Sequence, residues 1–351
     1  MLFFVIDLLA LGAINAIMAV GLNLQYGQAG ILNFTYYTFV AIGAYVAAVT
    51  TMGKPNVPPS LEQYVLQWRL PWPVGLLLAG VVAGVAGLLL VLLVIRRLRS
   101  DYLAIVTVSV GFIIWNVITN YIPLFNGANG LFSIPYILNG QTASAIDYTM
   151  EILGISLVVL AVCVWVARSI FRSPYGRVLR AIREDEVVAA SFGKSLTGSR
   201  VWAFVIGCAM GGLAGALLVF YLTAWNPAAF LAEESFILMA AIVIGGPGNY
   251  WGAVLGTFVF VEFLTEIARY FPNVGNGDLV GAGRAIFIGV VLIVVVRFRP
   301  EGLVPERWLH WYGRPGGGRS PGQSSAGTLP LRRWRSRRSG GGATQRSGTD
   351  A

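Results

Sequence analysis

Long runs of apolar residues follow one another along this chain and constrain its fold more than any other feature. A helix needs about 20 consecutive apolar residues to cross the hydrocarbon core of a bilayer, so most of these runs can cross it once. They cover residues 2–24, 32–52, 72–95, 102–122, 150–170, 201–223, 228–269 and 281–296. The pattern predicts an all-α, polytopic integral membrane helical bundle.

Composition and charge support the same fold class. Apolar residues make up 56% of the 351 positions and charged residues 12%, whereas soluble proteins devote about a quarter of their positions to charge. The formal net charge of +9 does not indicate nucleic-acid binding, because residues 300–351 carry nine arginines against three acidic residues. We therefore expect a transmembrane domain over residues 1–299 and a disordered Gly, Ser, Pro and Arg-rich tail over residues 300–351, which could also contact anionic lipid.

Few residues could support catalysis or metal binding. The single histidine, His310, lies outside the apolar runs, and Cys163 and Cys208 each stand alone within a run. A Ser/His dyad, a histidine metal site and a disulfide are therefore not expected. We expect that the chain is not an enzyme and binds no metal or cofactor itself.

The distribution of Lys and Arg predicts the topology, because these residues accumulate in cytoplasmic loops. Arg96, Arg97 and Arg99 form one cluster and residues 168–200 hold a second, whereas residues 121–149 contain neither Lys nor Arg. The run 228–269 is interrupted at Gly245–Asn249, and counting it as two helices places the basic tail inside. This count predicts about nine helices, with a range of eight to ten, an outside amino terminus and a cytoplasmic carboxyl terminus.

Two segments interrupt the apolar runs with glycine and polar residues, Tyr26–Asn33 and Gly245–Asn249. Irregular backbone at membrane depth is tolerated where protein covers it or where it lines an aqueous cavity, so such breaks can mark a transport path. The alternative is a short loop at the cytoplasmic interface, where the predicted topology places both segments. The candidate path residues are Gln28, Gly30, Asn33, Gly245, Gly246 and Asn249.

A third polar segment, residues 126–130, lies in the predicted outside loop. Asn126 and Asn129 are candidates for contact with a ligand or a docking partner there. The alternative is an ordinary turn, because Asn-Gly pairs are common turn residues.

Ionisable residues are rare inside the runs. Glu262, Glu266 and Arg269 share one helix face and would form a coupling-ion site in a secondary transporter. The favoured alternative is an internal ion pair that holds this face against Arg284. Small residues four positions apart, as at Gly80 and Gly84, predict close helix packing.

Residues 171–199 form the most informative segment. Proline and glycine open it, Gly193 closes it, and apolar residues repeat on one helical face between them. This pattern predicts one amphipathic helix whose exposed apolar ridge, Val178, Ile182, Ala189 and Phe192, a soluble partner with a groove would recognise; the alternative is a helix lying flat on lipid. The candidate docking residues are Gly176, Val178, Ile182, Arg183, Glu184, Asp185, Glu186, Ala189, Phe192 and Gly193.

A possible nucleotide motif lies at the end of this segment. Residues 193–195 read Gly-Lys-Ser, but Val188 stands where a phosphate-binding loop has its first glycine, and no strand is expected before it. We therefore expect any ATP to be bound by another chain.

Several motifs stand in a fixed order along the chain. They are Gly21–Leu24, Gly27–Gly30, Ile42–Tyr45, Asp101–Thr107, Asn126–Leu131, Arg180–Glu186, Ile244–Gly252 and Arg299–Leu303. Together they resemble the membrane subunits of branched-chain amino acid ATP-binding-cassette (ABC) importers, the LivH/LivM family, and favour the LivM type. The resemblance covers nearly all of residues 10–305, and the chain departs from the family pattern at Asn33–Tyr37 and Val187–Ala189.

The resemblance implies a permease subunit in the bacterial cytoplasmic membrane that works beside a second, LivH-type permease. It also implies two cytoplasmic ATP-binding subunits, which use ATP, and an extracytoplasmic substrate-binding protein. Residues 171–199 correspond to the ATPase-contacting loop of the family, with Gly193 matching its glycine. Branched-chain amino acids are the expected substrates, with urea or short amides as the alternative. A stand-alone ion-coupled transporter or channel is the alternative function.

Overall fold

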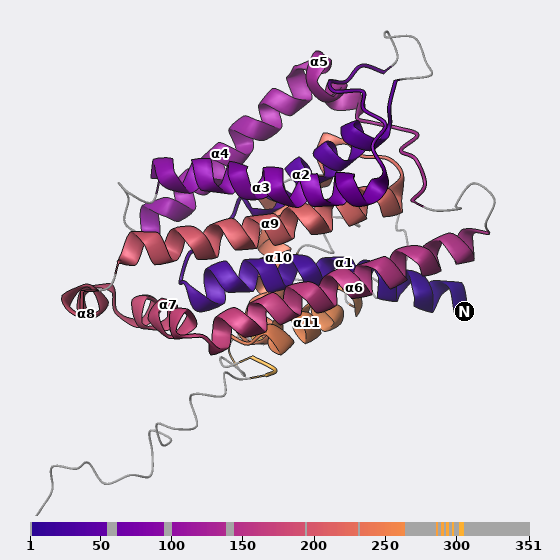
Figure 1. The fold of residues 1–351 in the computed structure, drawn as a ribbon. Coiled ribbons are helices and arrows are strands. Elements are labelled where there is room, and N and C mark those ends of the chain that lie inside the picture. The colour runs from indigo at the N-terminus through magenta and orange to yellow at the C-terminus, as the bar shows by residue number, and fades with distance from the viewer. Residues whose placement is uncertain are drawn as a thin grey trace, which may run out of the picture. The chain divides into compact units, whose positions relative to one another are not determined.

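The computed structural model describes residues 2–54, 62–94, 100–137, 144–193, 195–230, 232–263 and 302–304, together with residues 286, 289, 290, 293, 294 and 297. These residues belong to one unit, residues 1–307, and fold almost entirely into helices (Figure 1). The longer helices are α1 (Leu2–Asn23), α2 (Tyr36–Thr51), α3 (Trp72–Val94), α4 (Ser100–Asn120), α6 (Ala145–Arg172), α9 (Leu196–Leu222) and α10 (Ala232–Gly245). The shorter ones are η1 (Leu24–Gln28), α5 (Ile122–Phe125), η2 (Gly127–Asn129), α7 (Pro174–Glu184), α8 (Glu186–Ser191), η3 (Pro227–Phe230), α11 (Tyr250–Thr257) and η4 (Phe258–Phe263).

The helices confirm the prediction of a polytopic membrane fold. Among the described residues, five helices are long and apolar enough to cross a membrane: Phe3–Gln28, Trp72–Leu93, Tyr102–Asn120, Ala145–Arg172 and Leu196–Leu222. Three shorter apolar helices accompany them: Tyr36–Thr51, Glu234–Gly245 and Tyr250–Glu262. The predicted run 281–296 lies largely outside the described residues, so the nine-helix count stays a prediction. The tail over residues 300–351 lies outside them as well, apart from residues 302–304.

Helix α9 is central to the bundle and packs against α1, α2 and α3. Small residues allow the close approach: a Cβ atom on Gly43 of α2 would overlap the backbone of Gly212 of α9. On α3, a Cβ on Gly80 would lie 2.9 Å from Leu213 Cδ2, and one on Gly84 would lie 3.3 Å from Ala209 Cβ. These contacts confirm that the four-residue spacing of small residues serves helix packing, which in a bilayer depends on van der Waals contact between helices.

The two ends of α9 contact different loops. At its amino-terminal end Arg200 pairs with Glu186 of α8, and beyond its carboxyl-terminal end Trp225 and Leu131 exchange backbone hydrogen bonds of 2.8 and 2.9 Å. With 27 residues, α9 spans about 40 Å, more than the hydrocarbon core. Figure 1 likewise shows α7 and α8 at one end of the bundle and the amino terminus at the other. Leu131 and the helix pair α7–α8 thus lie near opposite ends of α9, and the side of the membrane on which each lies stays a prediction.

The break predicted within residues 228–269 is confirmed. Helix α10 ends at Gly245, and α11 begins at Tyr250 after a short turn. The two helices pack with Gly245 against Gly252 and Gly256, so the stretch forms a tight helical hairpin. Asn249 caps α11, because its Oδ1 accepts a hydrogen bond from the backbone N–H of Trp251 at 3.0 Å.

Candidate coupling and translocation site

The first interrupted segment begins where α1 widens into the π-helical turn η1. Such turns disturb the regular backbone hydrogen bonding of a helix and are frequent at functional sites. Gly30 follows with φ of +67°, a conformation that glycine adopts without strain. The chain then stays irregular until α2 begins at Tyr36.

The fold brings the two interrupted segments together. Asn23 donates from Nδ2 to the carbonyl oxygen of Asn249 at 3.0 Å, and its Oδ1 accepts a hydrogen bond from the Gly248 N–H at 3.0 Å. Gln28 donates from Nε2 to the carbonyl oxygen of Gly248 at 2.9 Å. These side chains satisfy backbone groups of the turn between α10 and α11, which would otherwise lack partners in a low-dielectric region.

Asn33 belongs to a second, buried polar network beside the first. It donates from Nδ2 to Oε1 of Gln25 at 2.9 Å, and its Oδ1 accepts from the Thr35 N–H at 3.1 Å. Gln25 in turn donates to the carbonyl oxygen of Phe204 on α9 at 2.9 Å. The sequence analysis missed Asn23 and Gln25 as site residues, although a polar residue at the end of a long apolar helix is a usable signal.

The predicted path residues are packed against protein in this conformation. Gln28, Asn33, Gly245 and Gly246 are buried. Residues 302–304 cover the hairpin turn, because Leu303 and Val304 donate backbone hydrogen bonds to Ile244 and Gly245 at 2.7 and 3.0 Å. These contacts fit the alternative of a covered junction at the end of the bundle, and a role of these residues in translocation stays a prediction.

Helix α7 lies against the same junction. Arg183 donates a hydrogen bond from Nη1 to the carbonyl oxygen of Gly27. A Cβ atom on Gly30 would lie 3.1 Å from Cγ of Arg183, so the absence of a side chain on Gly30 allows this approach. Arg183 thus connects the predicted docking segment directly with the first predicted path segment.

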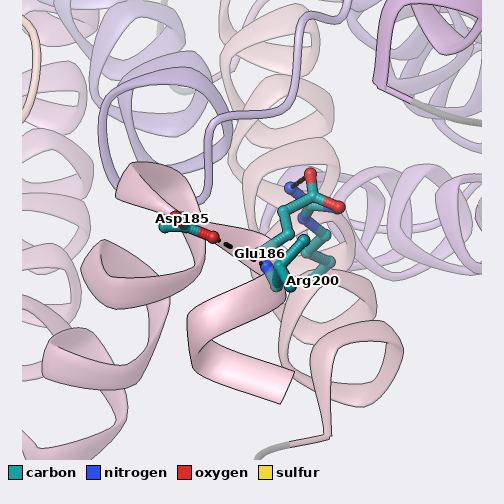
Figure 2. A network of polar contacts seen from close by, with 4 residues as sticks. Asp185, Glu186 and Arg200 are labelled. Atoms are coloured by element: carbon teal, nitrogen blue, oxygen red, sulfur yellow. Dashed lines mark hydrogen bonds and ion pairs between the residues drawn. The ribbon is translucent and has the colours of Figure 1, made fainter. Parts of the chain in front are cut away.

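The prediction of a single amphipathic helix between Ser173 and Gly193 is wrong. Asp185 has an extended backbone, with φ of −152°, and separates α7 from α8. Its Oδ1 accepts hydrogen bonds from the N–H groups of Val187 and Val188, both at 2.9 Å, so Asp185 caps α8 (Figure 2). Aspartate is a strong helix-initiating residue for this reason. Gly193 ends the segment with φ of +70°, which confirms its predicted role.

The predicted exposed ridge is also wrong in part. Ile182 is 0% exposed and Ala189 is buried, while Val178 is only partly exposed. The side chain of Phe192 is 76% exposed, and Val187 and Val188 are exposed on α8 as well. The reason is that the break at Asp185 turns α8 relative to α7, so one helical face does not continue through both. The solvent-facing apolar patch consists of Val187, Val188 and Phe192.

The remaining docking candidates divide by their contacts. Gly176 is buried, and Glu184 and Asp185 are exposed. Glu186 forms an ion pair with Arg200 on α9, which fixes the position of α8 (Figure 2). Tyr175 donates a hydrogen bond from its hydroxyl group to the carbonyl oxygen of Ser199 at 2.5 Å. Burial raises the pKa of Tyr175 to about 12, so this hydroxyl group keeps its proton at neutral pH.

The loop that precedes α6 uses Asn126 as a structural residue. Asn126 is buried, adopts φ of +64°, and donates from Nδ2 to the carbonyl oxygen of Gly130 at 2.7 Å. Its Oδ1 also accepts a hydrogen bond from the Gln63 N–H at 3.3 Å. These contacts favour the turn alternative for Asn126. Asn129 is exposed, and a ligand contact there stays a prediction.

Of the predicted charged cluster, only Glu262 lies within the described residues. Its Oε1 accepts a hydrogen bond from Nδ2 of Asn15 on α1 at 2.7 Å. Glu266, Arg269 and Arg284 lie outside the described part, so the proposed ion pair is not addressed. No group of three or more His, Cys, Asp or Glu residues that could hold a metal occurs among the residues that the structure describes.

These features define a multi-pass helical membrane protein with an interrupted first span and a helix pair packed on the end of the bundle. The chain belongs to the family of branched-chain amino acid transport system permease components, whose model matches residues 4–296. The match confirms the resemblance that the ordered motifs indicate.

Individual relatives agree with this family. The high-affinity branched-chain amino acid transport system permease protein LivM of Escherichia coli is 29% identical over 321 residues, which are 86% of this chain and 70% of the relative. The probable LivM of Methanocaldococcus jannaschii is 25% identical over 316 residues, 83% of this chain and 90% of the relative. The LivH protein of Salmonella typhimurium is 27% identical over 307 residues, 83% and 93% of the two chains. No solved structure matches this chain significantly.

Proposed function

We propose that this chain is the LivM-type permease subunit of an ABC importer that moves branched-chain amino acids across the bacterial cytoplasmic membrane. It has no enzymatic activity of its own. A LivH-type permease completes the transmembrane part, two cytoplasmic subunits hydrolyse ATP, and an extracytoplasmic protein delivers the amino acid. Family membership and the presence of both LivM and LivH relatives support this assignment. The amino terminus lies outside and the carboxyl terminus lies in the cytoplasm.

Helices α7 and α8 are the surface on which an ATPase docks. The patch of Val187, Val188 and Phe192 exposes apolar area at an end of the bundle that also carries Glu184 and Asp185. An apolar patch bordered by charges is typical of a surface that a protein groove covers. Glu186 and Tyr175 hold α8 and α7 against α9. A movement of the patch on ATPase binding is therefore transmitted to the membrane helices.

The hydrogen bond from Arg183 to Gly27 is the main support for a mechanism that couples ATP hydrolysis to transport. When the ATPases move α7, Arg183 moves the irregular segment after α1 with it. That segment holds the α10–α11 turn through Gln28, so both breaks respond together. Glycines at such breaks can absorb changes in backbone angles that a regular helix resists.

Reconstitution in liposomes tests the proposal. Leucine uptake should require this chain, a LivH-type subunit, the ATPases, the binding protein and ATP. Glu262→Gln should leave the ATP requirement unchanged, because the glutamine oxygen can still accept the hydrogen bond from Asn15. Uptake by this chain alone, driven by an ion gradient, would replace the proposal with an ion-coupled transporter.

A further inference from the structure

A cavity lies where the start of α2 meets α4, η3 and α10. Four of its nine lining residues are aromatic: Phe34, Phe112, Trp115 and Phe230. We propose that this cavity binds the branched apolar side chain of the transported amino acid, an inference that rests on the proposed function. An apolar wall of this kind suits an aliphatic side chain and suits urea poorly, because urea would lose hydrogen bonds to water there.

The cavity volume of about 100 Å³ restricts the occupant. An apolar protein cavity of about 150 Å³ accepts benzene. The smaller volume here suits the four carbons of a leucine side chain better than the ring of phenylalanine. Size and polarity together therefore select a branched aliphatic group.

Two hydroxyl groups provide polar partners at the wall. Thr38 is 4% exposed, and its hydroxyl makes no hydrogen bond within the described residues. Ser235 is 1% exposed, and its Oγ accepts a hydrogen bond from the Tyr37 N–H at 3.1 Å, while its hydroxyl hydrogen has no acceptor among the residues that the structure describes. A carboxylate oxygen beside the bound side chain would accept hydrogen bonds from these hydroxyl groups, which would offset part of the cost of removing it from water.

The position of Thr38 is defined by α4. A Cβ atom on Gly111 would lie 3.1 Å from Oγ1 of Thr38 and 2.8 Å from Cγ2 of Thr35. The missing side chain of Gly111 therefore allows α4 to pack closely against Thr35 and Thr38 at the cavity wall. Phe112, the next residue, is 62% exposed, so the cavity reaches the outer face of α4, from which a ligand or a lipid chain can enter.

The cavity is also connected with the coupling segment. Thr35 lines it, and the Thr35 N–H donates a hydrogen bond to Asn33 of the interrupted segment at 3.1 Å. Arg183 contacts that segment at Gly27. A movement of α7 can thus change the cavity through residues 27–35, which links binding of the side chain to ATP hydrolysis.

Uptake kinetics of the complete importer in liposomes test the assignment with three variants. Thr38→Val should raise KM for leucine about tenfold by removing one hydrogen bond. Gly111→Ala should reduce leucine uptake relative to alanine uptake by about the same factor, because the added methyl group would overlap Thr35 and displace the cavity wall. Phe112→Ala, at an exposed position, should add uptake of phenylalanine. Ser109→Val is the control, since Ser109 is exposed on α4 and lies outside the cavity.

The outcomes separate this inference from the proposed function. If the wild-type importer takes up leucine with ATP but the three variants behave like Ser109→Val, the cavity is not the side-chain site. Equal losses for alanine and leucine in Gly111→Ala would show that the cavity does not distinguish the side chains and would overturn the inference. Failure of the wild-type importer to move any amino acid would instead overturn the proposed function. Uptake of phenylalanine by Phe112→Ala supports the inference strongly, because misfolding cannot produce a gained activity.

Discussion

Arg183 on α7 donates a hydrogen bond to the carbonyl oxygen of Gly27, 156 positions earlier in the sequence. The contact joins a helix outside the membrane spans to the irregular segment that follows the first span. Hydrogen bonds to charged groups contribute about 1.5 to 3 kcal/mol, enough to keep the two segments together during a conformational change.

Arg183→Gln should therefore uncouple ATP hydrolysis from transport. We expect leucine uptake to fall at least about tenfold, the equivalent of about 1.4 kcal/mol, while the ATPases still co-purify. The matched control is Arg177→Gln, because Arg177 is exposed on the same helix. Uptake and ATPase activity can be measured in the same liposomes. Equal uptake by the two variants would remove Arg183 from the coupling mechanism.

Phe192→Asp should weaken ATPase docking without disturbing the membrane fold, since Phe192 is exposed directly after the last residue of α8. Burying a large apolar side chain contributes about 1.5 to 3 kcal/mol, so the loss should be about tenfold to a hundredfold in affinity. Co-purification of the ATPases and binding to immobilised permease measure it. Unchanged affinity would show that the Val187, Val188 and Phe192 patch contacts lipid.

Ile182→Asp should act differently from Phe192→Asp. The side chain of Ile182, on the inner face of α7, is fully buried. A buried unpaired charge at this position would destabilise the protein by several kcal/mol. We expect a lower yield and a lower midpoint of thermal unfolding, with loss of docking only as a consequence. Normal stability combined with lost docking would restore the interpretation of Ile182 as an interface residue.

Gly193→Val should misplace α8 through backbone strain. Gly193 has φ of +70°, and a Cβ atom there would meet no atom within 4 Å, so steric overlap with neighbours is not the cause. The left-handed conformation costs an L-residue about 1 to 2 kcal/mol, whereas asparagine tolerates it better. ATPase co-purification should fall for Gly193→Val and survive for Gly193→Asn. Similar behaviour of both variants would rule out strain as the cause.

Cysteine labelling tests the topology. A membrane-impermeant thiol reagent added to intact cells should label Ala128→Cys and spare Ala190→Cys, because both positions are exposed. Ala128 closely follows α5 in the chain and Ala190 lies on α8, and these two helices lie at opposite ends of the bundle (Figure 1). Two positions outside the described residues extend the test: a cysteine at position 143 should be labelled, and a cysteine at position 320 should not. The native Cys163 and Cys208 are buried and should give little background. Labelling of Ala190→Cys would show that α8 lies outside, which contradicts the proposed orientation.

The sequence by itself determined the features that depend on local patterns. Run length and low charge predict the membrane helices, Gly245–Asn249 predicts the break before α11, and Gly193 predicts the helix end. Each of these follows from residues close together in the chain, through hydrophobic length, turn chemistry or glycine conformation. The family motifs are also read in order along the chain, without knowledge of any contact.

Only the tertiary structure decided which surfaces face solvent and which distant residues meet. Asn23 contacts Gly248 and Asn249 across more than 220 positions, and helical periodicity contains no information about such pairs. The burial of Ile182 depends on how Asp185 breaks the helix and on how α7 packs against α6 and α9. Likewise the close contact of α4 with Thr35 and Thr38 beside the cavity depends on the missing side chain of Gly111. An apolar residue has the same pattern in the sequence whether it faces the bundle or a partner, and only packing distinguishes the two.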